Sequence, residues 1–477
     1  SWRLRLFRAS HSRIRADPVA AADPACERVV QARLGEQRCR LEITKPGSLD
    51  SLALVAQARP ATLEPDEVEV EVRAAALNFR DVMRAMGLYP AEDDTPAVGL
   101  EAAGVVLRVG RAVQSVAPGD AVIAVGAGAF GTHVVVPEAC CVRKPEGWSF
   151  AEAAAATGVL MTAHVALVWV ARVARGESVL VHSATGGVGL AALQVCRAHG
   201  CEVYATCGRA EKRAYLVAHE GVPPERVHSS RSVAFAGAIR AQTGGRGVDV
   251  VLNSLMGEGL LRSLELLAPQ GRFVEIGKRD IYDNTPVGLR PFAHNALLAS
   301  VAVDEYFKRN RPYAHRLLAE VVGLMAAGTY RPIPHTAYAL PDAVRAFRHM
   351  ASATHIGKIV VTVDPAQTAS VTLRAPAALR PDATYVVAGL GGMGAALVEW
   401  LLARGARAVA ALSPLRSAGS RAQVDELTTR AQEQHNGAVF RAFQCDLADE
   451  ARVRAIITEE IARAGLPAVR GVVHAAG

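Results

Sequence analysis

The chain has 477 residues, a net charge of +7, 51% apolar and 21% charged residues. This length is enough for roughly two to four domains with buried cores, and the composition excludes a disordered or fibrous chain. The eight cysteines form no CxxC pair, so neither a disulfide scaffold nor a four-thiolate zinc lobe is predicted, and we expect a reducing, cytoplasmic location. The basic charges are too dispersed to favour nucleic acid, and apolar runs break short of the ~20 residues of a membrane span. Neither nucleic acid nor a membrane is therefore expected as a partner.

The two ends of the chain indicate an excerpt of a larger polypeptide. It begins at Ser1 without a methionine and stops at Gly477 within an apparent domain. Residues 1–27 start "SWRLRLF", where apolar residues alternate with arginine as on a half-buried strand. We expect this segment to be a remnant of a preceding domain or a linker.

A β-rich region is predicted from about residue 39 to residue 142. Its segments are short, β-branched and punctuated by turns, as in "EVEVEVRAAALNF", "AGVVLRVG" and "APGDAV". Much later, "PDAVRAFRHMASATHIGKIVVTV" ends in another strand. We expect that strand to rejoin the β-rich region, which makes the intervening segment an insertion.

The intervening segment alternates strands and helices. After a helical stretch, "PEGWSFAEAAAATGVLMTAHVAL", the strands "SVLVH", "EVYAT", "VDVVLNS" and "GRFVEIG" follow between residues 178 and 278. Such alternation predicts a doubly wound parallel sheet. The first strand leads into a glycine turn and a helix, where the backbone can approach a pyrophosphate and the helix N-terminus meets its charge. We predict that the turn binds a dinucleotide through Thr185, Gly186, Gly187, Val188 and Gly189.

The end of the second strand predicts the coenzyme. It reads Thr206, Cys207, Gly208 and Arg209, with Lys212 one turn further on. No carboxylate is present there to repel a ribose 2′-phosphate, and two cations could pair with one. We therefore expect NADPH rather than NADH; the alternative is that both cations are only solvated.

A second nucleotide-binding unit is predicted near the C-terminus. Residues 365–381 are rich in Pro, Ala and Thr and read as a linker. The following segment repeats the strand, glycine turn and helix, with Gly389, Gly391, Gly392 and Gly394. Ser413 and Arg416 follow its second strand without an acid, which again favours a phosphorylated ribose.

Several phrases together resemble one known family. "LNFRDVM", "GLYP", "GLEAAGVV", "VLVHSATGGVG", "GVDVVLNSL", "GRFVEIGKRDIY" and "HIGKIVVTV" resemble the enoylreductase region of a type I polyketide synthase, closest in wording to the mycocerosic acid synthase type. This resemblance covers nearly all of residues 40–364, and residues 382–477 are similar to the start of a ketoreductase domain.

The resemblance implies an α/β fold of the medium-chain dehydrogenase/reductase superfamily. A GroES-like β-rich substrate domain would span residues 28–155 and 295–364, with a Rossmann domain of doubly wound parallel sheet inserted at 156–294. A truncated second Rossmann-type unit would occupy 382–477. The ketoreductase Tyr, Lys and Ser would lie past residue 477, so no carbonyl reduction is expected from this chain.

The implied chemistry uses no metal. Zinc-dependent members of the superfamily carry Gly-His-Glu where this chain has Gly99, Leu100 and Glu101, and leucine cannot bind zinc. The adjacent Cys140 and Cys141 cannot replace the missing structural-zinc lobe, because neighbouring residues of a strand point different ways. The resemblance implies hydride transfer from NADPH to Cβ of an α,β-unsaturated thioester and protonation at Cα. The substrate would be tethered by phosphopantetheine to an acyl carrier protein, with neighbouring synthase domains as further partners and a homodimer among the expected assemblies.

Three residues are candidates for catalysis. Lys278 follows the strand "RFVEIG" at the carboxyl edge of the sheet, where a cation could stabilise the enolate or donate the proton. The alternative for Lys278 is a solvated surface lysine or a structural ion pair with Asp280 or Asp304. By resemblance, Tyr89 lies near Cα and could donate a proton, or it could simply pack at a turn. Asp304 resembles the acid that accompanies the lysine.

Further residues are predicted to line the cofactor site. By resemblance Asn78 and Thr162 contact the nicotinamide and its ribose, and Asp446 contacts the adenine of the second unit. Asn253, Ser254 and Gly277 end strands that open on the same crevice. The polar side chains among them could instead satisfy local backbone groups.

Two rival functions remain open at this stage. One is a free-standing zinc-free quinone or alkenal oxidoreductase of the zeta-crystallin type, against which the attached second nucleotide fold argues. The other is a non-catalytic NADP-binding scaffold within a multienzyme, since a fold alone does not establish activity.

Overall fold

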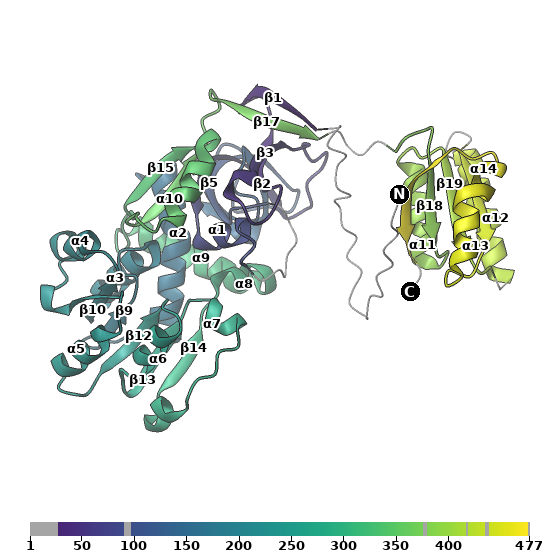
Figure 1. Ribbon diagram of the computed structural model, residues 1–477. Helices are drawn as coiled ribbons and strands as arrows, with labels where there is room; N and C mark the ends of the chain where they lie inside the picture. Colours follow the sequence, from purple (N-terminus) through teal and green to yellow (C-terminus); the bar gives the residue numbers. More distant parts are fainter. Residues whose placement is uncertain (1–26, 90–96, 375–378, 416–417, 435–437, 476–477) are drawn as a thin grey trace. The chain divides into compact units, whose positions relative to one another are not determined.

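The computed structural model describes residues 27–89, 97–374, 379–415, 418–434 and 438–475. Residues 1–26 of the expected remnant, residues 90–96 and Arg416 lie outside these ranges. The chain divides into one compact unit of residues 28–373 and a second that holds residues 374–477. Figure 1 colours the first unit from purple to green and the second from green to yellow.

The first unit contains the predicted β-rich domain. Its main sheet has the order β15-β16-β4-β5-β6-β8, and β7 also pairs with β4. The alternation in "EVEVEV" places Val68, Val70 and Val72 of β4 in the core. The strands of this sheet are β4 (Glu67–Leu77), β5 (Glu101–Val109), β6 (Ala121–Val125), β7 (His133–Pro137), β8 (Cys141–Arg143), β15 (His335–Ala339) and β16 (Lys358–Thr362). Helices α1 (Phe79–Ala85) and α10 (Ala343–Ala351) belong to this domain.

The return of the chain to this domain is confirmed, because β16 pairs antiparallel with β4. The predicted linker at 365–381 is wrong in its first half. Residues 368–374 form β17 (Thr368–Arg374) in a small sheet of order β1-β17-β3-β2, with β1 (Glu27–Arg33), β2 (Cys39–Ile43) and β3 (Leu52–Ala56). The segment "TASVTLR" has no helical period but alternates as a strand does, with Ala369 and Val371 buried.

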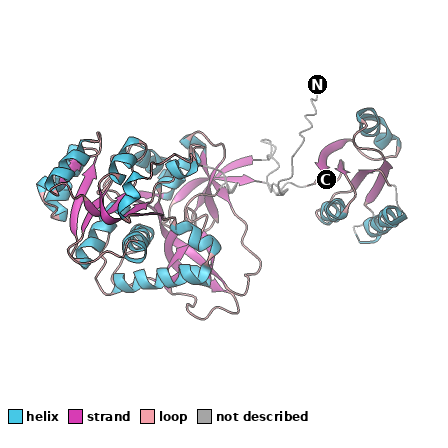
Figure 2. Cartoon of the chain, turned by 90° about the horizontal axis from the view of Figure 1, so that it is seen from below, coloured by secondary structure: helices cyan, strands magenta, loops and turns pink. Residues whose placement is uncertain are grey.

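The inserted domain is a parallel sheet of order β11-β10-β9-β12-β13-β14. Its strands are β9 (Ser178–Val181), β10 (Glu202–Cys207), β11 (Val227–Ser229), β12 (Val248–Asn253), β13 (Leu267–Glu275) and β14 (Leu297–Ser300). Successive residues of β9 enter different cores: Val179 and Val181 pack with α2 and α3, whereas Leu180 packs with α5 and α6. Helices therefore cover both faces of the sheet, as Figure 2 shows.

The predicted boundary of this domain at residue 294 falls short of the structure. The sixth strand, β14, begins at Leu297, and the buried face of α9 shares the core of α2. The sequence did not reveal β14 because this edge strand is short and largely exposed. The helices of the domain are α2 (Phe150–His164), α3 (Gly187–His199), α4 (Ala210–Glu220), α5 (Ala234–Gln242), α6 (Glu258–Leu264), α7 (Arg279–Tyr282), α8 (Val303–Arg309) and α9 (Arg311–Ala326).

Helix α2 continues into a π-helical segment at Val165–Val170. Together they form a helix of 21 residues with a mean hydropathy of 1.7, long and apolar enough to cross a membrane by length and composition. The expectation that every apolar run breaks well short of this length is therefore wrong. Because 72% of the apolar window is buried inside the protein, the helix fits the core of this unit, where it packs against α3, β4 and β5.

The second unit contains a parallel sheet with helices on both faces. Its parallel sheet has the order β20-β19-β18-β21, with β18 (Thr384–Ala388), β19 (Ala408–Ser413), β20 (Val439–Gln444) and β21 (Val469–His474). Val387 and Val409 pack with α11 on one face, and Val386 and Ala410 pack with Ile461 of α14 on the other. The helices are α11 (Gly392–Ala403), α12 (Ala418–Gln434), α13 (Glu450–Ala455) and α14 (Ile461–Arg463).

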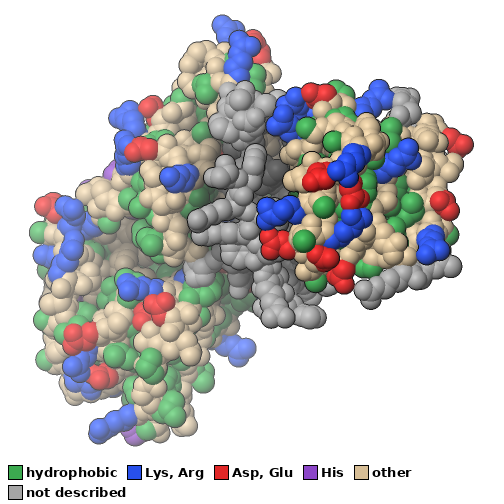
Figure 3. Space-filling view, turned by 45° about the vertical axis from the view of Figure 1, so that its right-hand side comes forward, with side chains coloured by type: hydrophobic (Ala, Val, Ile, Leu, Met, Phe, Trp, Pro, Cys, Tyr) green, Lys and Arg blue, Asp and Glu red, His purple; other side chains and the backbone are tan. Residues whose placement is uncertain are grey.

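Surface charges are mixed on the face of the described residues drawn in Figure 3. Lys and Arg side chains are scattered there among Asp and Glu side chains and green apolar ones.

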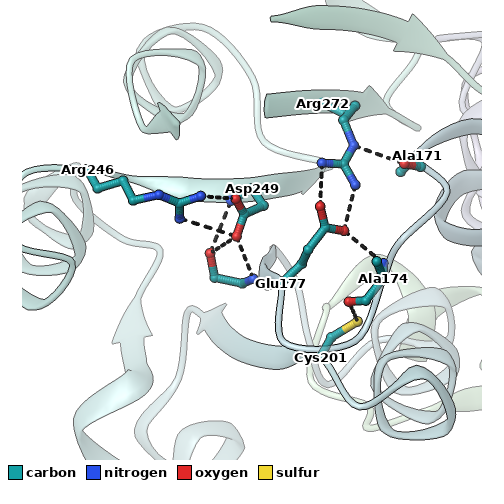
Figure 4. Close-up of polar contacts among 8 residues, drawn as sticks. Ala171, Ala174, Glu177, Cys201, Arg246, Asp249 and Arg272 are labelled. Atoms are coloured by element: carbon teal, nitrogen blue, oxygen red, sulfur yellow. Dashed lines mark hydrogen bonds and ion pairs between the residues drawn. The ribbon is translucent and has the colours of Figure 1, made fainter. Parts of the chain in front are cut away.

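A polar network ties together the amino ends of the strands in the inserted sheet (Figure 4). Arg272 donates to both carboxylate oxygens of Glu177 at 2.8 and 2.7 Å. Asp249 accepts from Arg246 and from the backbone and hydroxyl of Ser178. Each of these two carboxylates is already bonded to an arginine and to a backbone N–H, so this edge of the sheet has a structural role. Ligands of doubly wound folds bind at the opposite, carboxyl edge.

Candidate active site

The glycine turn after β9 has the geometry of a phosphate cradle. Helix α3 begins at Gly187, and no side chain caps its N-terminus at Gly186. A Cβ on Gly189 would lie 2.5 Å from Ala184 Cα and 2.5 Å from the Ser183 oxygen, so only glycine fits there. Thr185 is buried and Val188 packs on the core, which leaves their backbone to meet a ligand. The turn fits a pyrophosphate held at a helix N-terminus.

The end of β10 gathers cations. Arg209 is exposed at the N-cap of α4, and Lys212 Nζ donates to the Ala353 oxygen at 3.0 Å. Burial lowers the pKa of Lys212, and the neighbouring Arg209 lowers it further. A third cation, Arg231, was missed by the sequence analysis: its Nε would lie 2.9 Å from a Cβ on Gly208. Arg231 follows the next strand, β11, and only the parallel pairing of β10 with β11 brings it here.

The β-rich domain closes on the same turn. Gly357, just before β16, donates to the Thr185 oxygen at 2.8 Å and forms an isolated bridge with Gly186. With the bond from Lys212 to Ala353, the segment 353–357 contacts both the pyrophosphate turn and the ribose end of the site. The two domains therefore meet at the proposed nucleotide site.

A buried lysine holds Asn78 beside this junction. Lys358 Nζ donates to the Leu77 oxygen at 2.9 Å, to Asn78 Oδ1 at 2.7 Å and to Glu101 Oε1 at 3.1 Å. Asn78 Nδ2 donates to the same Glu101 oxygen at 2.9 Å, while Gly158 N donates to Glu101 Oε2 at 2.6 Å. Lys358 was not singled out from the sequence, although "HIGKIVVTV" contains it.

The residues present do not fit a zinc ion. Leu100 offers no ligand atom, and its neighbour Glu101 is bonded to Lys358, Asn78 and Gly158. No group of three or more His, Cys, Asp or Glu side chains within the described residues could hold a metal.

Several side chains that were predicted to line the cofactor site form hydrogen bonds within the protein. The Thr162 hydroxyl donates to the Gly158 oxygen at 2.8 Å within α2. Asn253 is fully buried, and its amide donates to the Leu255 oxygen and to Glu275. The local alternative therefore describes Asn253 better than a direct cofactor contact. Ser254, in contrast, lies against the glycine turn, where its hydroxyl donates to Ser183 Oγ at 2.9 Å.

Glu275 is a buried acid that the sequence analysis did not identify. It ends β13 and accepts hydrogen bonds from Asn253 and from the backbone of Gly277, the residue before Lys278. Burial raises the pKa of Glu275 to about 7, against the lowering effect of these hydrogen bonds. A Cβ on Gly277 would lie 2.6 Å from Glu275 Oε1, which favours glycine at that position.

The three catalytic candidates gather in one cluster. Lys278 Nζ lies 3.7 Å from Asp304 Oδ1, whereas Asp280, its other suggested partner, bonds to Thr285 and Gly257. Asp304 also faces Arg80, with 3.9 Å between Nε and Oδ2. The Arg80 guanidinium carbon lies 5.1 Å from the centre of the Tyr89 ring. Arg80 thus links Tyr89 to the Lys278–Asp304 pair, and nothing in the sequence except its place in "LNFRDVM" marked it.

The second glycine turn repeats the first. Gly389 has φ +98°, and a Cβ on Gly394 would lie 2.0 Å from the Gly389 oxygen. Gly391 caps α11, which begins at Gly392. Ser413 is buried at the end of β19. Asp446 is exposed after β20, where its Oδ1 accepts from Ala448 N at 3.0 Å. The residues predicted to bind a nucleotide thus lie at the carboxyl edge of this sheet.

Fold and site together define a class. A β-rich domain and an inserted six-stranded parallel sheet, joined at a glycine turn, form a two-domain reductase of the medium-chain dehydrogenase/reductase superfamily. Residues 64–146 match the family described as alcohol dehydrogenase GroES-like domain, residues 225–361 match zinc-binding dehydrogenase, and residues 383–477 match KR domain. The second of these families is named for zinc binding, but the residues of this chain do not fit a zinc ion, as described above.

Relatives narrow the class to a family. The chain is 41% identical over 447 residues to a highly reducing polyketide synthase of Aspergillus terreus, an alignment that covers 92% of this chain and 17% of that protein. The crystal structure of CurK enoyl reductase matches with 33% identity and a TM-score of 0.62, covering 69% of this chain and all of that one. Quinone oxidoreductase of Escherichia coli complexed with NADPH matches with 26% identity and a TM-score of 0.58, covering 68% of this chain and 99% of that one. The chain belongs to the polyketide synthase enoyl reductases, followed by part of a ketoreductase domain.

Proposed function

We propose that residues 28–373 reduce an α,β-unsaturated acyl thioester to the saturated thioester with NADPH. This proposal rests on one cluster of side chains, formed by Lys278, Asp304, Tyr89 and Arg80. The cluster brings candidate catalytic groups from both domains together, in the same unit that contains the glycine turn. Lys278 follows β13 at the carboxyl edge of the sheet, where doubly wound folds bind their ligands.

The preference for NADPH rests on charge. Arg209, Lys212 and Arg231 surround the end of β10, where residues 206–209 include no carboxylate. The matched quinone oxidoreductase is itself described as complexed with NADPH. Three cations suit a ribose 2′-phosphate, which carries about two negative charges.

The reaction follows from what the side chains can do. The glycine turn of residues 185–189 would hold NADPH, which would supply a hydride to Cβ. As the new C–H bond forms, the π electrons of the substrate's C=C bond would form a double bond between Cα and the thioester carbon, and the carbonyl π electrons would move to oxygen, where the positive charge of Lys278 stabilises the enolate. Asp304, 3.7 Å from Lys278, holds that ammonium group in place. The Tyr89 phenol supplies the proton to Cα, in competition with water.

The partners follow from the chemistry of a tethered substrate. We propose an acyl carrier protein that presents the enoyl chain on phosphopantetheine, with neighbouring synthase domains on the same polypeptide. The homodimer is supported by β14, an edge strand whose Leu297 and Leu298 are 63% and 44% exposed, because an uncovered apolar edge favours pairing. The proposed location is the cytoplasm, since the seven cysteines within the described ranges are all unpaired.

Comparison of two substrates tests the function. Oxidation of NADPH is followed with crotonyl thioester and with a quinone, using the full chain. We expect turnover of the thioester to exceed that of the quinone. Faster reduction of the quinone would support the oxidoreductase alternative, and NADPH binding without reduction of either substrate would support the scaffold alternative.

Variants assign the roles. K278A and Y89F should slow thioester reduction by about 10² or more, as loss of an electrostatic or acid–base group does, while NADPH affinity changes little. The matched control is K308A on α8, because the one ion pair of Lys308 among the described residues is with Glu305 on the surface. Normal reduction by both K278A and Y89F would contradict the assigned roles.

A further inference from the structure

Asp304 faces one cation from each domain. Lys278 follows β13 of the inserted sheet, and Arg80 lies on α1 of the β-rich domain. The distances to the two carboxylate oxygens are 3.7 and 3.9 Å. The side chains of Arg80 and Asp304 are only 13% and 16% exposed, so their mutual attraction is less screened than that of a surface pair. Asp304 is therefore a charge contact between the two domains.

The contact between Arg80 and Asp304 is not closed by a hydrogen bond. At 3.9 Å the atoms are too far apart, and both Arg80 Nε and Asp304 Oδ2 are buried without a hydrogen-bond partner among the described residues. Buried polar atoms without partners are rare in folded proteins and call for an explanation.

Arg80 also fixes the ring of Tyr89. Its guanidinium carbon lies 5.1 Å from the ring centre, within the range of a cation–π contact. Tyr282 of α7 packs edge-on against the same ring, with 6.1 Å between centroids and 72° between planes. A planar guanidinium can stack face to face on a ring while its edge faces a carboxylate, whereas an ammonium group has no planar face to stack.

We propose that Arg80 is a positioning residue for both halves of the reaction. Through Asp304 it fixes Lys278 at the enolate oxygen, and through the stacked ring it holds the Tyr89 hydroxyl on one face of Cα. This inference rests on the proposed reduction of enoyl thioesters. It predicts that Arg80 controls the configuration of the product at Cα as well as the rate.

The test uses a substrate that acquires a stereocentre at Cα. The full chain reduces a 2-methylbut-2-enoyl thioester with NADPH, and the ratio of 2R to 2S product is measured beside kcat and the Kd of NADPH. We expect an excess of one configuration from the wild type. In R80Q, kcat should fall roughly 10- to 100-fold, as a misplaced catalytic group predicts, and the excess should shrink toward equal amounts while Kd changes less than about twofold.

Two further variants separate positioning from folding. The control is R84Q on the same helix, because Arg84 donates to the Ala97 oxygen at 2.8 Å; it should leave the ratio unchanged. R80K keeps the charge without the planar stack, so it should recover part of kcat but not the configuration. It also serves as the test if R80Q fails to unfold cooperatively in urea.

The outcomes are distinguishable. A wild-type ratio and kcat in R80Q or, where R80Q does not fold, in R80K would overturn the role of Arg80 while leaving the proposed function intact. Equal amounts of the 2R and 2S products from the wild type would contradict the proposal that the Tyr89 hydroxyl is held on one face of Cα. Absence of any thioester reduction by the wild type would overturn the proposed function and this inference with it.

Discussion

The double substitution R209Q/K212Q should convert the chain from an NADPH-binding protein into one that barely distinguishes NADPH from NADH. At about 4 Å in water a pair of unit charges is worth about 1 kcal/mol. A 2′-phosphate carries about −1.5 to −2 charges. Arg209 is exposed and Lys212 half-buried, so we expect each to contribute about 1.5 kcal/mol and both together about 3 kcal/mol. At about 1.4 kcal/mol per tenfold change this is roughly 100-fold in Kd.

Calorimetric titration of both coenzymes in about 0.1 M salt measures this effect. The ratio of the two Kd values is the decisive quantity, because Lys212 also bonds to the Ala353 oxygen and its loss could weaken both coenzymes equally. R231Q should lower the ratio further. The control is R262Q, whose guanidinium forms ion pairs, within the part of the chain that the structure describes, only with Glu258 and Glu265 on the surface. Equal losses of NADPH and NADH affinity in the double variant would refute the phosphate contact.

Three further outcomes are expected. G189A should abolish nucleotide binding and lower the free energy of unfolding in urea by about 1–3 kcal/mol, because its Cβ would lie 2.5 Å from Ala184 Cα. The control is G237A, whose Cβ meets nothing within 4 Å and which should be neutral or slightly stabilising. Equal effects of the two substitutions would contradict the steric argument. Burial raises the pKa of Glu275 to about 7 from 4.5, so this group loses its proton at lower pH in the unfolded chain than in the folded one. The free energy of unfolding should therefore fall by roughly 3 kcal/mol as pH rises from 4.5 to 7. E275Q should lack this part of the decline, and a pH profile of E275Q equal to that of the wild type would contradict the raised pKa of Glu275. K358M leaves Glu101 buried without its cation and should lower the free energy of unfolding in urea by about 3–5 kcal/mol. The double variant K358M/E101Q should recover part of this loss. If the losses of the two single variants simply add in the double variant, Lys358 and Glu101 are not coupled.

Local features of the chain were predictable from the sequence. The glycine turn at residues 185–189 was identified because strand, turn and helix follow one another within a few residues, and each has its own periodicity. The cations Arg209 and Lys212 were identified for the same reason, since they follow the next strand directly. The resemblance to enoylreductases supplied Tyr89 and Asp304, which no periodicity would have selected, and Lys278 was identified from its position after a strand together with that resemblance.

Errors arose where local patterns were weak. The strand at residues 368–374 was taken for a linker, and β14 lies beyond the predicted boundary at 294. Short or exposed edge strands carry little periodic signal, and their pairing depends on strands distant in the chain. The length of the apolar helix at 150–170 was underestimated because its π-helical end continues α2 without a break.

The sequence by itself determined two domains, a dinucleotide turn, a cationic ribose end and the replacement of a zinc ligand by Leu100. Only the tertiary structure decided which groups meet around the reacting atoms. Arg80, Tyr89, Lys278 and Asp304 come from segments up to 224 positions apart, and Arg231 reaches the cofactor site only by strand pairing. Backbone turns and burial periods depend on neighbours in the chain and so are encoded locally. Contacts across a domain junction depend on how β16 returns to β4 and therefore exist only in the folded protein.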